Sequence, residues 1–395
     1  MKDFLLSSDF YPMIGGAHHW LYNVYSRWPS PVTVFAGSQP NDDTDAIARQ
    51  KAVDAGDHGS LLIRRIDLSF SDIDILSFAF WKKMLAAVRS ISAATGRGQT
   101  TLHCLRAFPD GLLGLAWKAL APRRRRIVIF AHGEEITSAG SSRQLTILSY
   151  WIYKISTLVI ANSLNTETLV RSHTPSAKTV VIHPGVIPAD FLFPEEKLVY
   201  ARAVYGFTPN DIVLVTVARI ETHKNHANVL KAMRRLLDSG LQLKYLIVGG
   251  GGEEQTLRTL AKDLCLEQAV KFAGFLPDRE RSLAMALADI HIMPSINNGL
   301  VFEGFGIVFI EAAAAGIPSI AGNVGGQAEA VLHGKTGLVI DGANVDAIVV
   351  AIRQLAEKPR LRHEMGEAGR QWAAAHEWPS VAVRTFEEIR RATGI

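Results

Sequence analysis

The sequence predicts an α/β protein built from two parallel-sheet domains, and three observations support this prediction. The chain has 395 residues, a length that suggests two or three domains. Short apolar runs alternate with helical patterns along residues 1–185, as they do in βαβ units. A second series of the same kind begins with the apolar run Ile212–Val217, so the two halves of the chain share a layout.

The composition is that of a globular protein with ample core, because 48% of the residues are apolar and 20% are charged. No apolar stretch reaches the roughly 18 residues needed to span a bilayer. No secretory signal precedes the first expected strand, Phe4–Ser7. Cys104 and Cys265 match no metal-binding spacing and are expected to be buried thiols. These features predict a cytoplasmic protein.

The net charge of +4 is unevenly distributed along the chain. The first 185 residues carry 20 Lys/Arg and 14 Asp/Glu, whereas the remainder carries 22 and 24. A basic first half predicts an anionic surface or ligand for that half. The densest positive site is Arg123–Arg126, although such runs are usually solvated edges. No nucleic-acid-binding motif occurs, so nucleic acid is not expected as a partner.

One expected helix of the first half, Phe78–Ser92, has two interpretations. Trp81, Leu85 and Val88 share one face of it, and Lys82, Lys83 and Arg89 are among its polar positions. The first interpretation is a surface helix packed on the sheet. The second is a membrane-contacting face, which a basic amphipathic helix favours.

Apolar runs bounded by turn residues give the expected strands of the first half. They are Phe4–Ser7, Val32–Ala36, Leu61–Ile66, Thr101–Leu105, Ile127–Phe130, Leu158–Ala161 and Val180–Ile182. A helical pattern covers Trp20–Arg27, and the polar, acidic stretch Gln39–Gly59 is expected to be a loop.

Two features of the first half point to a ligand at the carboxyl edge of its sheet. Gly15 and Gly16 stand between the first strand and the first helix, where an α/β sheet brings its backbone to a ligand. Most such glycine pairs are only turns, and at least one of the flanking His18 and His19 is expected to be structural. His132 directly follows a strand, which places it at the same edge.

The second half has expected strands at Ile212–Val217, Tyr245–Val248, Val270–Ala273 and Ile290–Met293. Arg219 and Lys224 come just after the first of them. Two fixed cations at a strand end suit a pyrophosphate whose charge must be stabilised as it leaves. The alternative is a pair of exposed basic residues.

Two glutamates, Glu303 and Glu311, stand eight residues apart with two glycines and an apolar run between them. The pattern predicts a loop over residues 303–306 and then a helix that carries Glu311 and ends at Gly316. The start of such a helix leaves backbone N–H groups free for a ligand, and a carboxylate on each side suits a polyhydroxylated, phosphorylated molecule. The alternative is a capped surface helix with two solvated glutamates.

Residues 303–329 read EGFGIVFIEAAAAGIPSIAGNVGGQAE, and the pattern continues through Gly334, Thr336 and Gly337. This stretch resembles the signature of the retaining glycosyltransferases of family 4, which have the GT-B fold. The resemblance implies two Rossmann-like parallel-sheet domains that face each other across a deep cleft. It places an acceptor-side domain at 1–190, a donor-side domain at 191–375 and a helix returning to the first domain at 376–395.

The resemblance also implies an activity. A hexosyl unit would pass from a nucleoside diphosphate sugar, GDP-mannose or a UDP-sugar, to a glycan or lipid-linked acceptor with retention of configuration. Surface polysaccharide or glycolipid biosynthesis is the expected setting, with peripheral contact at the inner face of an anionic membrane. No cofactor and no metal are implied, because two cations could take the place of a divalent ion and no Asp-x-Asp pair lies near the expected site.

Site roles are carried over by the same resemblance. The implied catalytic residues are Glu303, Arg219, Lys224 and His132. The implied donor-binding residues are Gly15, Gly16, Arg219, Lys224, Gly250, Phe275, Leu276, Gly304, Phe305, Gly306, Ile307 and Glu311. The sequence departs from the family at Asn225, where a glycine is usual, and at Ile296–Phe302, which is longer than the usual link.

Two other classes of protein share this architecture. Non-hydrolysing UDP-sugar 2-epimerases are isomerases whose catalytic carboxylates are placed differently, and they lack the glutamate pair. A catalytically inactive sugar-nucleotide-binding scaffold is the third possibility, and the complete set of arginine, lysine and glutamates argues against it.

Overall fold

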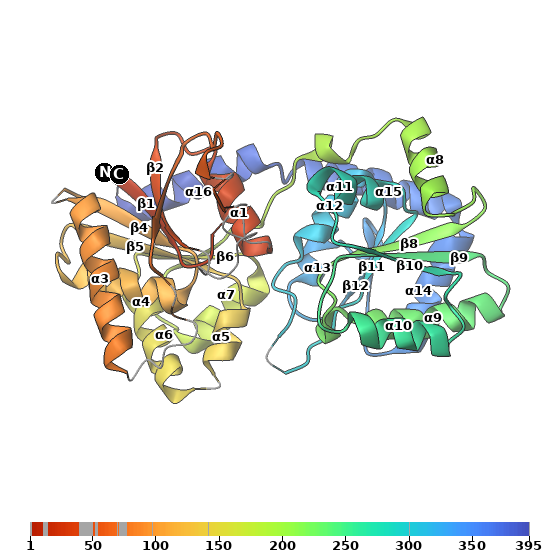
Figure 1. The fold of residues 1–395 in the computed structure, drawn as a ribbon, viewed down its shortest axis with the longest axis horizontal. Helices are drawn as coiled ribbons and strands as arrows, with labels where there is room; N and C mark the ends of the chain where they lie inside the picture. Colours follow the sequence, from red (N-terminus) through yellow and green to blue (C-terminus); the bar gives the residue numbers. More distant parts are fainter. Residues whose placement is uncertain are drawn as a thin grey trace. The chain divides into compact units, whose positions relative to one another are not determined.

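The chain forms two compact α/β units. The computed structural model describes residues 2–10, 15–38, 50–51, 54–68, 70, 77–96, 98–140, 142–299 and 301–394. The first unit consists of Met1–Pro184 together with Trp378–Ile395, and the second is Gly185–Glu377. Each unit is built on its own parallel sheet (Figure 1), which confirms the predicted fold class.

The first unit has a seven-stranded parallel sheet in the order β3-β2-β1-β4-β5-β6-β7. Its strands are β1 (Lys2–Ser7), β2 (Val32–Gly37), β3 (Leu61–Ile66), β4 (Thr100–Cys104), β5 (Arg125–Ala131), β6 (Leu158–Ala161) and β7 (Thr179–Val181). The order reverses between β1 and β4, which is the Rossmann arrangement.

Helices cover both faces of this sheet. They are α1 (Gly16–Tyr25), α3 (Phe78–Thr95), the turn η1 (Ala107–Gly111), α4 (Leu112–Ala119), α5 (Glu134–Ala139), α6 (Arg143–Ile155), α7 (Leu164–His173) and α16 (Trp378–Thr393). Side chains alternate between the two faces of β1. Phe4 and Leu6 join the core under α3, α4 and α6, whereas Asp3 accepts hydrogen bonds from Trp28 and from Arg390 of α16.

The second unit repeats this plan with six parallel strands in the order β10-β9-β8-β11-β12-β13. These are β8 (Ile212–Val217), β9 (Leu243–Val248), β10 (Val270–Gly274), β11 (Ile290–Met293), β12 (Ser319–Gly322) and β13 (Gly337–Ile340). Its helices and helical turns are η2 (Pro188–Phe191), α8 (Glu195–Val204), η3 (Thr222–Lys224), α9 (His226–Asp238), α10 (Glu254–Asp263), α11 (Asp278–Ala286), α12 (Ile307–Ala315), α13 (Gln327–Ala330), α14 (Val345–Glu357) and α15 (Pro359–Ala374).

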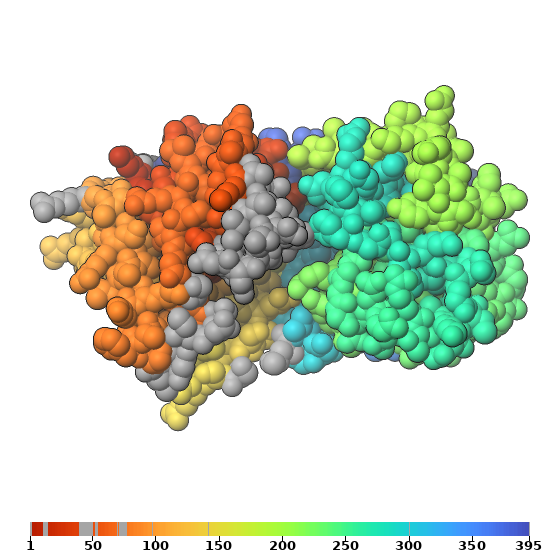
Figure 2. All heavy atoms as spheres, in the orientation of Figure 1, coloured from red at the N-terminus to blue at the C-terminus, as the bar shows by residue number. Residues whose placement is uncertain are grey.

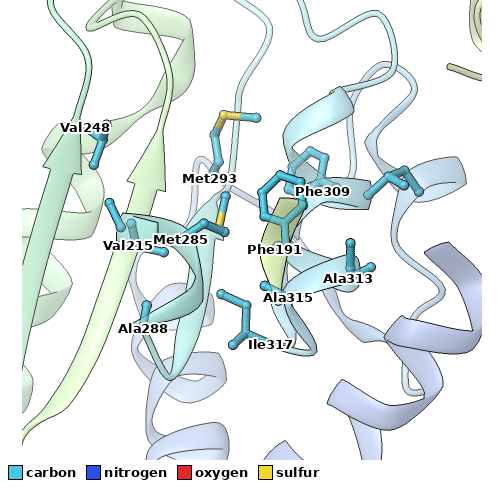
Figure 3. Packing of buried hydrophobic residues seen from close by; sticks show 14 of the residues in the cluster. Phe191, Val215, Val248, Met285, Ala288, Met293, Phe309, Ala313, Ala315 and Ile317 are labelled. Atoms are coloured by element: carbon cyan, nitrogen blue, oxygen red, sulfur yellow. The ribbon is translucent and has the colours of Figure 1, made fainter. Parts of the chain in front are cut away.

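Two apolar cores fill the second unit, one on each face of its sheet. Val213 and Val215 of β8 point to the core under η2, α11 and α12, and Leu214 points to the core under α9 and α14. Figure 3 shows Val215, Met285 and Phe309 among the side chains of the first of these cores. Because α12 is apolar on nearly every side, it is held firmly at the carboxyl edge of the sheet.

The structure corrects two expectations from the sequence and leaves a third mostly outside the described residues. In α3 the side chains of Trp81 and Leu85 are half exposed, and the helix packs on the sheet through Phe80, Met84 and Val88. Cys104 is buried, but Cys265 is exposed, so only one of the two thiols lies inside the protein. Most of the loop expected at Gln39–Gly59 lies outside the described residues.

Candidate functional site

The predicted site residues follow the carboxyl ends of strands at or near the point where each sheet reverses its order, between β1 and β4 in the first unit and between β8 and β11 in the second. In the first unit Gly15 and Gly16 come after β1, and His132 comes after β5. In the second unit Arg219 and Lys224 come after β8, and the segment that leads to Glu303 comes after β11. Ligands of open α/β sheets bind at the carboxyl ends of the strands beside such a switch point.

Arg219 and Lys224 occupy different environments in the second unit. The Arg219 side chain is largely exposed, and its guanidinium lies 2.7 Å from Oε1 of Glu221. Lys224 ends the turn η3 and is 14% exposed, as is Glu303. The Lys224 Nζ donates to Oε2 of Glu303 at 2.5 Å. The structure therefore brings Lys224 and Glu303 into contact across 79 residues of sequence.

Asn225, which stands where the resemblance leads one to expect glycine, has the left-handed backbone that glycine would provide, with φ of 66°. Its side-chain amide donates to the carbonyls of Pro294 and Gly342, at 3.0 and 2.6 Å. The backbone N–H of Ile296 donates to His223 O at 2.9 Å. The turn that carries Lys224 is thereby fastened to the segment that leads to Glu303.

The loop before α12 is shaped by glycines. Gly306 caps α12 with φ of 86°, and a Cβ there would approach the Phe309 ring to 2.6 Å. The backbone of Gly325–Gly326 packs against this loop, since Gly326 N–H donates to Glu303 O at 2.9 Å. A Cβ on either of those two glycines would meet a loop carbonyl within 2.2 Å. Their role in the motif is therefore close packing.

The first turn of α12 has backbone N–H groups without helical partners, at the positions predicted for donor binding. Ile307 is its first residue, and Gly304 to Gly306 lead into it. Phe305, in contrast, packs its ring into the core of the second unit, where it is 2% exposed. Phe305 is thus left with its backbone as the part that a ligand can contact.

Glu311 is buried, which differs from the solvated glutamate that a surface helix would carry. Its Oε2 accepts from Nη1 of Arg281 at 2.8 Å. The negative charge of Glu311 raises the pKa of Arg281, so the guanidinium stays charged. The sequence pattern gave no sign of this partner, because Arg281 stands among the other charged residues at the start of α11.

The glycine-rich turn after β9 is packed against the end of β8. A Cβ on Gly249 or Gly251 would meet the carbonyls of Ala218 or Ile220 within 2.3 Å, whereas one on Gly250 would meet only Glu254 Oε2, at 3.9 Å, and one on Gly252 would meet nothing within 4 Å. Gly250 and Gly252 are therefore the members of the run that a ligand can approach closely. Phe275 and Leu276 follow β10, with the Phe275 ring 65% exposed and Leu276 packed on the core.

In the first unit, Gly15 precedes α1 and its backbone is extended. Its Cα faces the ring of His18, which a Cβ would approach to 3.2 Å. Burial lowers the pKa of His18 to about 4, and the positive charge of Arg106 adds to this effect. His19 packs its ring edge-on against Trp378 at 5.6 Å, which indicates a structural role for this histidine.

His132 lies at the end of β5 and is partly buried. Its Nε2–H donates to Leu105 O at 2.9 Å, and its ring packs edge-on against Trp20. Burial, reinforced by the Arg106 charge, lowers the pKa of His132 to about 4. The imidazole is therefore neutral near pH 7, and its Nδ1 can accept a hydrogen bond.

Sequence reasoning missed a charged group beside these histidines. Arg106 pairs with Asp9 at 2.9 Å, and the nearby Asp110 accepts from the backbone N–H of Ser8 at 2.9 Å. Asp110 is fully buried, and burial raises its pKa to about 7. These residues follow β1 and β4, so their position at strand ends was the available signal.

The structure gathers the predicted residues into small groups. Lys224 and Glu303 form one pair, and Glu311 forms a separate pair with Arg281. Arg219 is held by Glu221, which also lies 3.4 Å from His223. In the part of the chain that the structure describes, no three His, Cys, Asp or Glu side chains are grouped to hold a metal ion. Across the same residues, none of the helices has the length and apolar character needed to cross a bilayer.

Two family models match the chain, one in each half. The model described as Glycosyltransferase Family 4 matches residues 14–190. The model described as Glycosyl transferases group 1 matches residues 201–372. Together they cover the sheet of the second unit, all strands of the first sheet except β1, and every site residue predicted from the sequence.

The chain is also similar to characterised proteins. A GDP-mannose-dependent alpha-(1-6)-phosphatidylinositol monomannoside mannosyltransferase of Mycolicibacterium smegmatis is 35% identical over 298 residues, 71% of this chain and 74% of the relative. A GDP-mannose-dependent monoacylated alpha-(1-6)-phosphatidylinositol monomannoside mannosyltransferase of Corynebacterium glutamicum is 29% identical, over 95% of this chain and 94% of the relative. Anabaena Alr3699/HepE, solved in complex with UDP, superposes with a TM-score of 0.81 at 20% identity and covers 99% of this chain and all of its own.

Proposed function

The chain belongs to glycosyltransferase family 4 and is a glycosyltransferase, and from this premise we propose that it transfers a hexosyl unit from a nucleoside diphosphate sugar with retention of configuration. The pairing of Lys224 with Glu303 is the observation that carries the proposal. It sets a cation suited to a diphosphate directly beside a carboxylate suited to the sugar that leaves it.

GDP-mannose is the donor that we propose, with UDP-sugars as the second choice. The support is the similarity to two GDP-mannose-dependent mannosyltransferases, one of which aligns over 95% of this chain. Both relatives are named for phosphatidylinositol monomannoside acceptors. We therefore propose a lipid-linked acceptor and a place in glycolipid or surface polysaccharide biosynthesis.

In the second unit we assign the donor contacts residue by residue. Arg219 and Lys224 stabilise the diphosphate as negative charge builds on it, and Glu303 positions the sugar. Backbone N–H groups at Gly304–Ile307 bind phosphate oxygen. Glu311 accepts hydrogen bonds from the ribose hydroxyls, and the base lies along Gly250 and Phe275–Leu276. Two cations then do what a divalent metal does in other transferases, so we propose that the reaction needs no metal.

In the first unit, the domain that we assign to the acceptor, Gly15 and Gly16 offer backbone to the diphosphate at the start of α1. His132 contacts the donor sugar. Because its Nε2–H is already donated to Leu105 O, the contact is made by Nδ1, which accepts from a sugar hydroxyl. His132 therefore orients the sugar and takes no part in proton transfer at neutral pH.

We also propose that the first unit docks on an anionic membrane through its layer of α3, α4 and α6. Apolar side chains stand exposed on the outer side of this layer: Phe78, Trp81, Leu85, Leu120, Ile147, Trp151 and Ile155. The three helices contain no Asp or Glu and six Lys or Arg residues. The outer side of α3 (orange) is open at the surface in Figure 2. Exposed apolar stripes edged by cations match a leaflet of anionic lipid.

The proposal is tested by donor binding and by product analysis. GDP-mannose and GDP should each stabilise the folded protein by about 2.7 kcal/mol when present at 100 times the dissociation constant. The melting temperature should rise accordingly. Turnover of GDP-mannose with a lipid-linked mannoside should continue in EDTA and give a product with the anomeric configuration of the donor. Release of an epimer without acceptor would contradict the transferase reaction, and an inverted product would contradict retention of configuration. Activity that EDTA abolishes and magnesium restores would contradict metal independence.

A further inference from the structure

Glu311 is the only charged residue of α12, a helix whose other members are apolar. Its side chain is 8% exposed and its Oε2 lies 2.8 Å from Nη1 of Arg281 in α11. The second carboxylate near Arg281 is Asp278, at 3.5 Å and almost fully exposed. Solvent screens that contact, so Glu311 is the partner that holds the guanidinium.

A buried ion pair usually adds little to the stability of the folded state. The free energy of removing two charges from water is about as large as their electrostatic attraction, and apolar side chains of similar size often give equal stability. The surroundings of α12 are apolar and could accept such a replacement. The pair is better explained by what it does for Glu311 than by what it adds to the fold.

Arg281 is also well placed to link two parts of the donor site. It lies in the first turn of α11, where its backbone N–H donates to Pro277 O at 2.8 Å. This helix directly follows Phe275–Leu276, the segment assigned to the nucleotide base. The side chain then reaches α12, which carries the carboxylate assigned to the ribose. One residue thus connects the base segment to the ribose carboxylate.

We propose that Arg281 is a positioning residue that holds the Glu311 carboxylate oriented toward the ribose hydroxyls of the nucleotide. This inference rests on the proposed function, since it requires that Glu311 binds the ribose. Arg281 occupies Oε2, which leaves Oε1 as the acceptor for a hydroxyl. It also supplies the positive charge that lets a buried carboxylate stand near a diphosphate. The rigid guanidinium directs Nη1 to Glu311 while its Nη2 faces Asp278, whereas lysine offers a single point charge.

The test compares GDP with 2′,3′-dideoxy-GDP, and UDP with its dideoxy form, by calorimetric binding to the purified full chain. The wild type should bind the ribonucleotide about 10- to 150-fold more tightly than the dideoxy form, the range for a charge-assisted hydrogen bond. Arg281→Met should bind the two forms within a few-fold of each other. Arg281→Lys should recover part of the preference, and the control Arg279→Met, an exposed arginine in the same turn, should keep it in full.

A double variant separates positioning from a general loss of structure. Arg281→Met/Glu311→Gln removes both buried charges, so its melting temperature without ligand should exceed that of Arg281→Met. If Arg281 acts through Glu311, this double variant should bind GDP as Glu311→Gln does, with no added loss. Turnover should show a raised donor KM with kcat reduced far less, because the ribose contact is made in ground and transition states alike.

Each outcome has a distinct meaning. Retained preference for the ribonucleotide in Arg281→Met would overturn the positioning role and leave the proposed function standing. A wild type that binds GDP or UDP without preferring the ribose would remove the role of Glu311, and the inference with it. A wild type that binds no nucleoside diphosphate would overturn the proposed function itself.

Discussion

The Nζ of Lys224 lies 2.5 Å from Oε2 of Glu303, so a residue assigned to the diphosphate and one assigned to the sugar form a pair. Both side chains are mostly buried. Each charge compensates the other, since an isolated buried charge is costly. When a diphosphate binds, the lysine gains a second anionic partner. Removing either side chain therefore leaves the buried charge of the other without its partner.

The two glutamates should give different kinetic defects. Glu303→Gln should lower kcat more than it raises the donor KM, because its interaction grows as positive charge develops on the sugar. Glu311→Gln should mainly raise the donor KM. A lost charge-assisted contact corresponds to about 10- to 150-fold in either constant. Steady-state kinetics would check this, with Glu280→Gln, an exposed glutamate of α11, as the control.

The melting temperatures of the two glutamate variants should be measured together with their kinetics. Glu311→Gln leaves Arg281 with only a weak, exposed partner, so a lower melting temperature is expected for this variant, in contrast to a glutamate in open solvent. Full kcat in a folded Glu303→Gln enzyme would show that the sugar lies elsewhere.

Asn225 should be replaceable by glycine only in part. Asn225→Gly keeps the left-handed backbone but loses the amide that binds Pro294 O and Gly342 O. Asn225→Ala loses the amide and must also enter the left-handed region, at a further cost of about 1–2 kcal/mol. The melting temperature should therefore fall in the order wild type, glycine variant, alanine variant, and kcat should fall in both variants because Lys224 is less well held. A glycine variant with unchanged melting temperature and kcat would contradict this account.

Membrane docking should depend on two of the four consecutive arginines. Arg125 is turned inward, where it lies over the Trp117 ring and donates to Trp117 O, and Arg126 donates to Thr393 O. Only Arg123 and Arg124 of the run are exposed. Replacing both by serine should weaken binding to anionic vesicles about 25-fold, from roughly 1 kcal/mol for each cation.

Co-sedimentation with vesicles of anionic or neutral lipid would measure this binding. It should weaken as salt is added, since surface charges are screened. The control Arg353→Ser/Arg360→Ser removes one partly exposed and one exposed arginine of the second unit and should leave binding unchanged. Equal binding to neutral and anionic vesicles would count against docking through these cations.

Acid should destabilise the protein through its buried histidines. Burial lowers the pKa of His291 from 6.5 to about 3, so the unfolded chain binds more protons than the folded chain below pH 6.5. The stability that this residue contributes is complete above about pH 6.5 and is lost as the pH falls toward the folded pKa, by about 1.4 kcal/mol per pH unit. The melting temperature of His291→Asn should therefore fall less than that of the wild type between about pH 7.5 and pH 5.5.

Asp110 should act in the opposite direction. Its pKa is raised from 3.8 to about 7, so the folded chain binds more protons than the unfolded chain between these values. The contribution of this group to folding stability therefore rises as the pH falls. In Asp110→Asn the melting temperature should decrease more steeply with falling pH than in the wild type. Melting curves at matched ionic strength would measure both slopes, and parallel slopes for the three proteins would refute the assignment of these groups.

Strands were the most predictable part of this fold. Leu61–Ile66, Ile212–Val217 and Ile290–Met293 have the bounds expected from the sequence, because short runs rich in Ile, Val and Leu between turn residues favour strands in an α/β chain. The start of α12 at Ile307 likewise follows from the glycines before it. The bounds of these strands and the start of α12 depend on residues close together in the sequence, so the local sequence pattern predicts them.

Side-chain partners were not predictable in the same way. Arg281 and Glu311 are 30 residues apart, and no spacing rule links two different helices. In α3, apolar residues lie on more than one side, so periodicity alone could not decide that Val88 faces the sheet while Trp81 and Leu85 face outward. The residue roles at the site stay predictions until the variants above are measured.

The return of α16 to the first unit sets an order for synthesis. Asp3 and Trp28 have Arg390 and Phe386 of α16 as partners, and Arg390 lies 387 residues after Asp3 in the chain. The second unit is continuous in sequence and has all of its strands once Gly337–Ile340 has emerged. The first unit must therefore wait, with part of its core uncovered, until the second unit and then α16 have been synthesised.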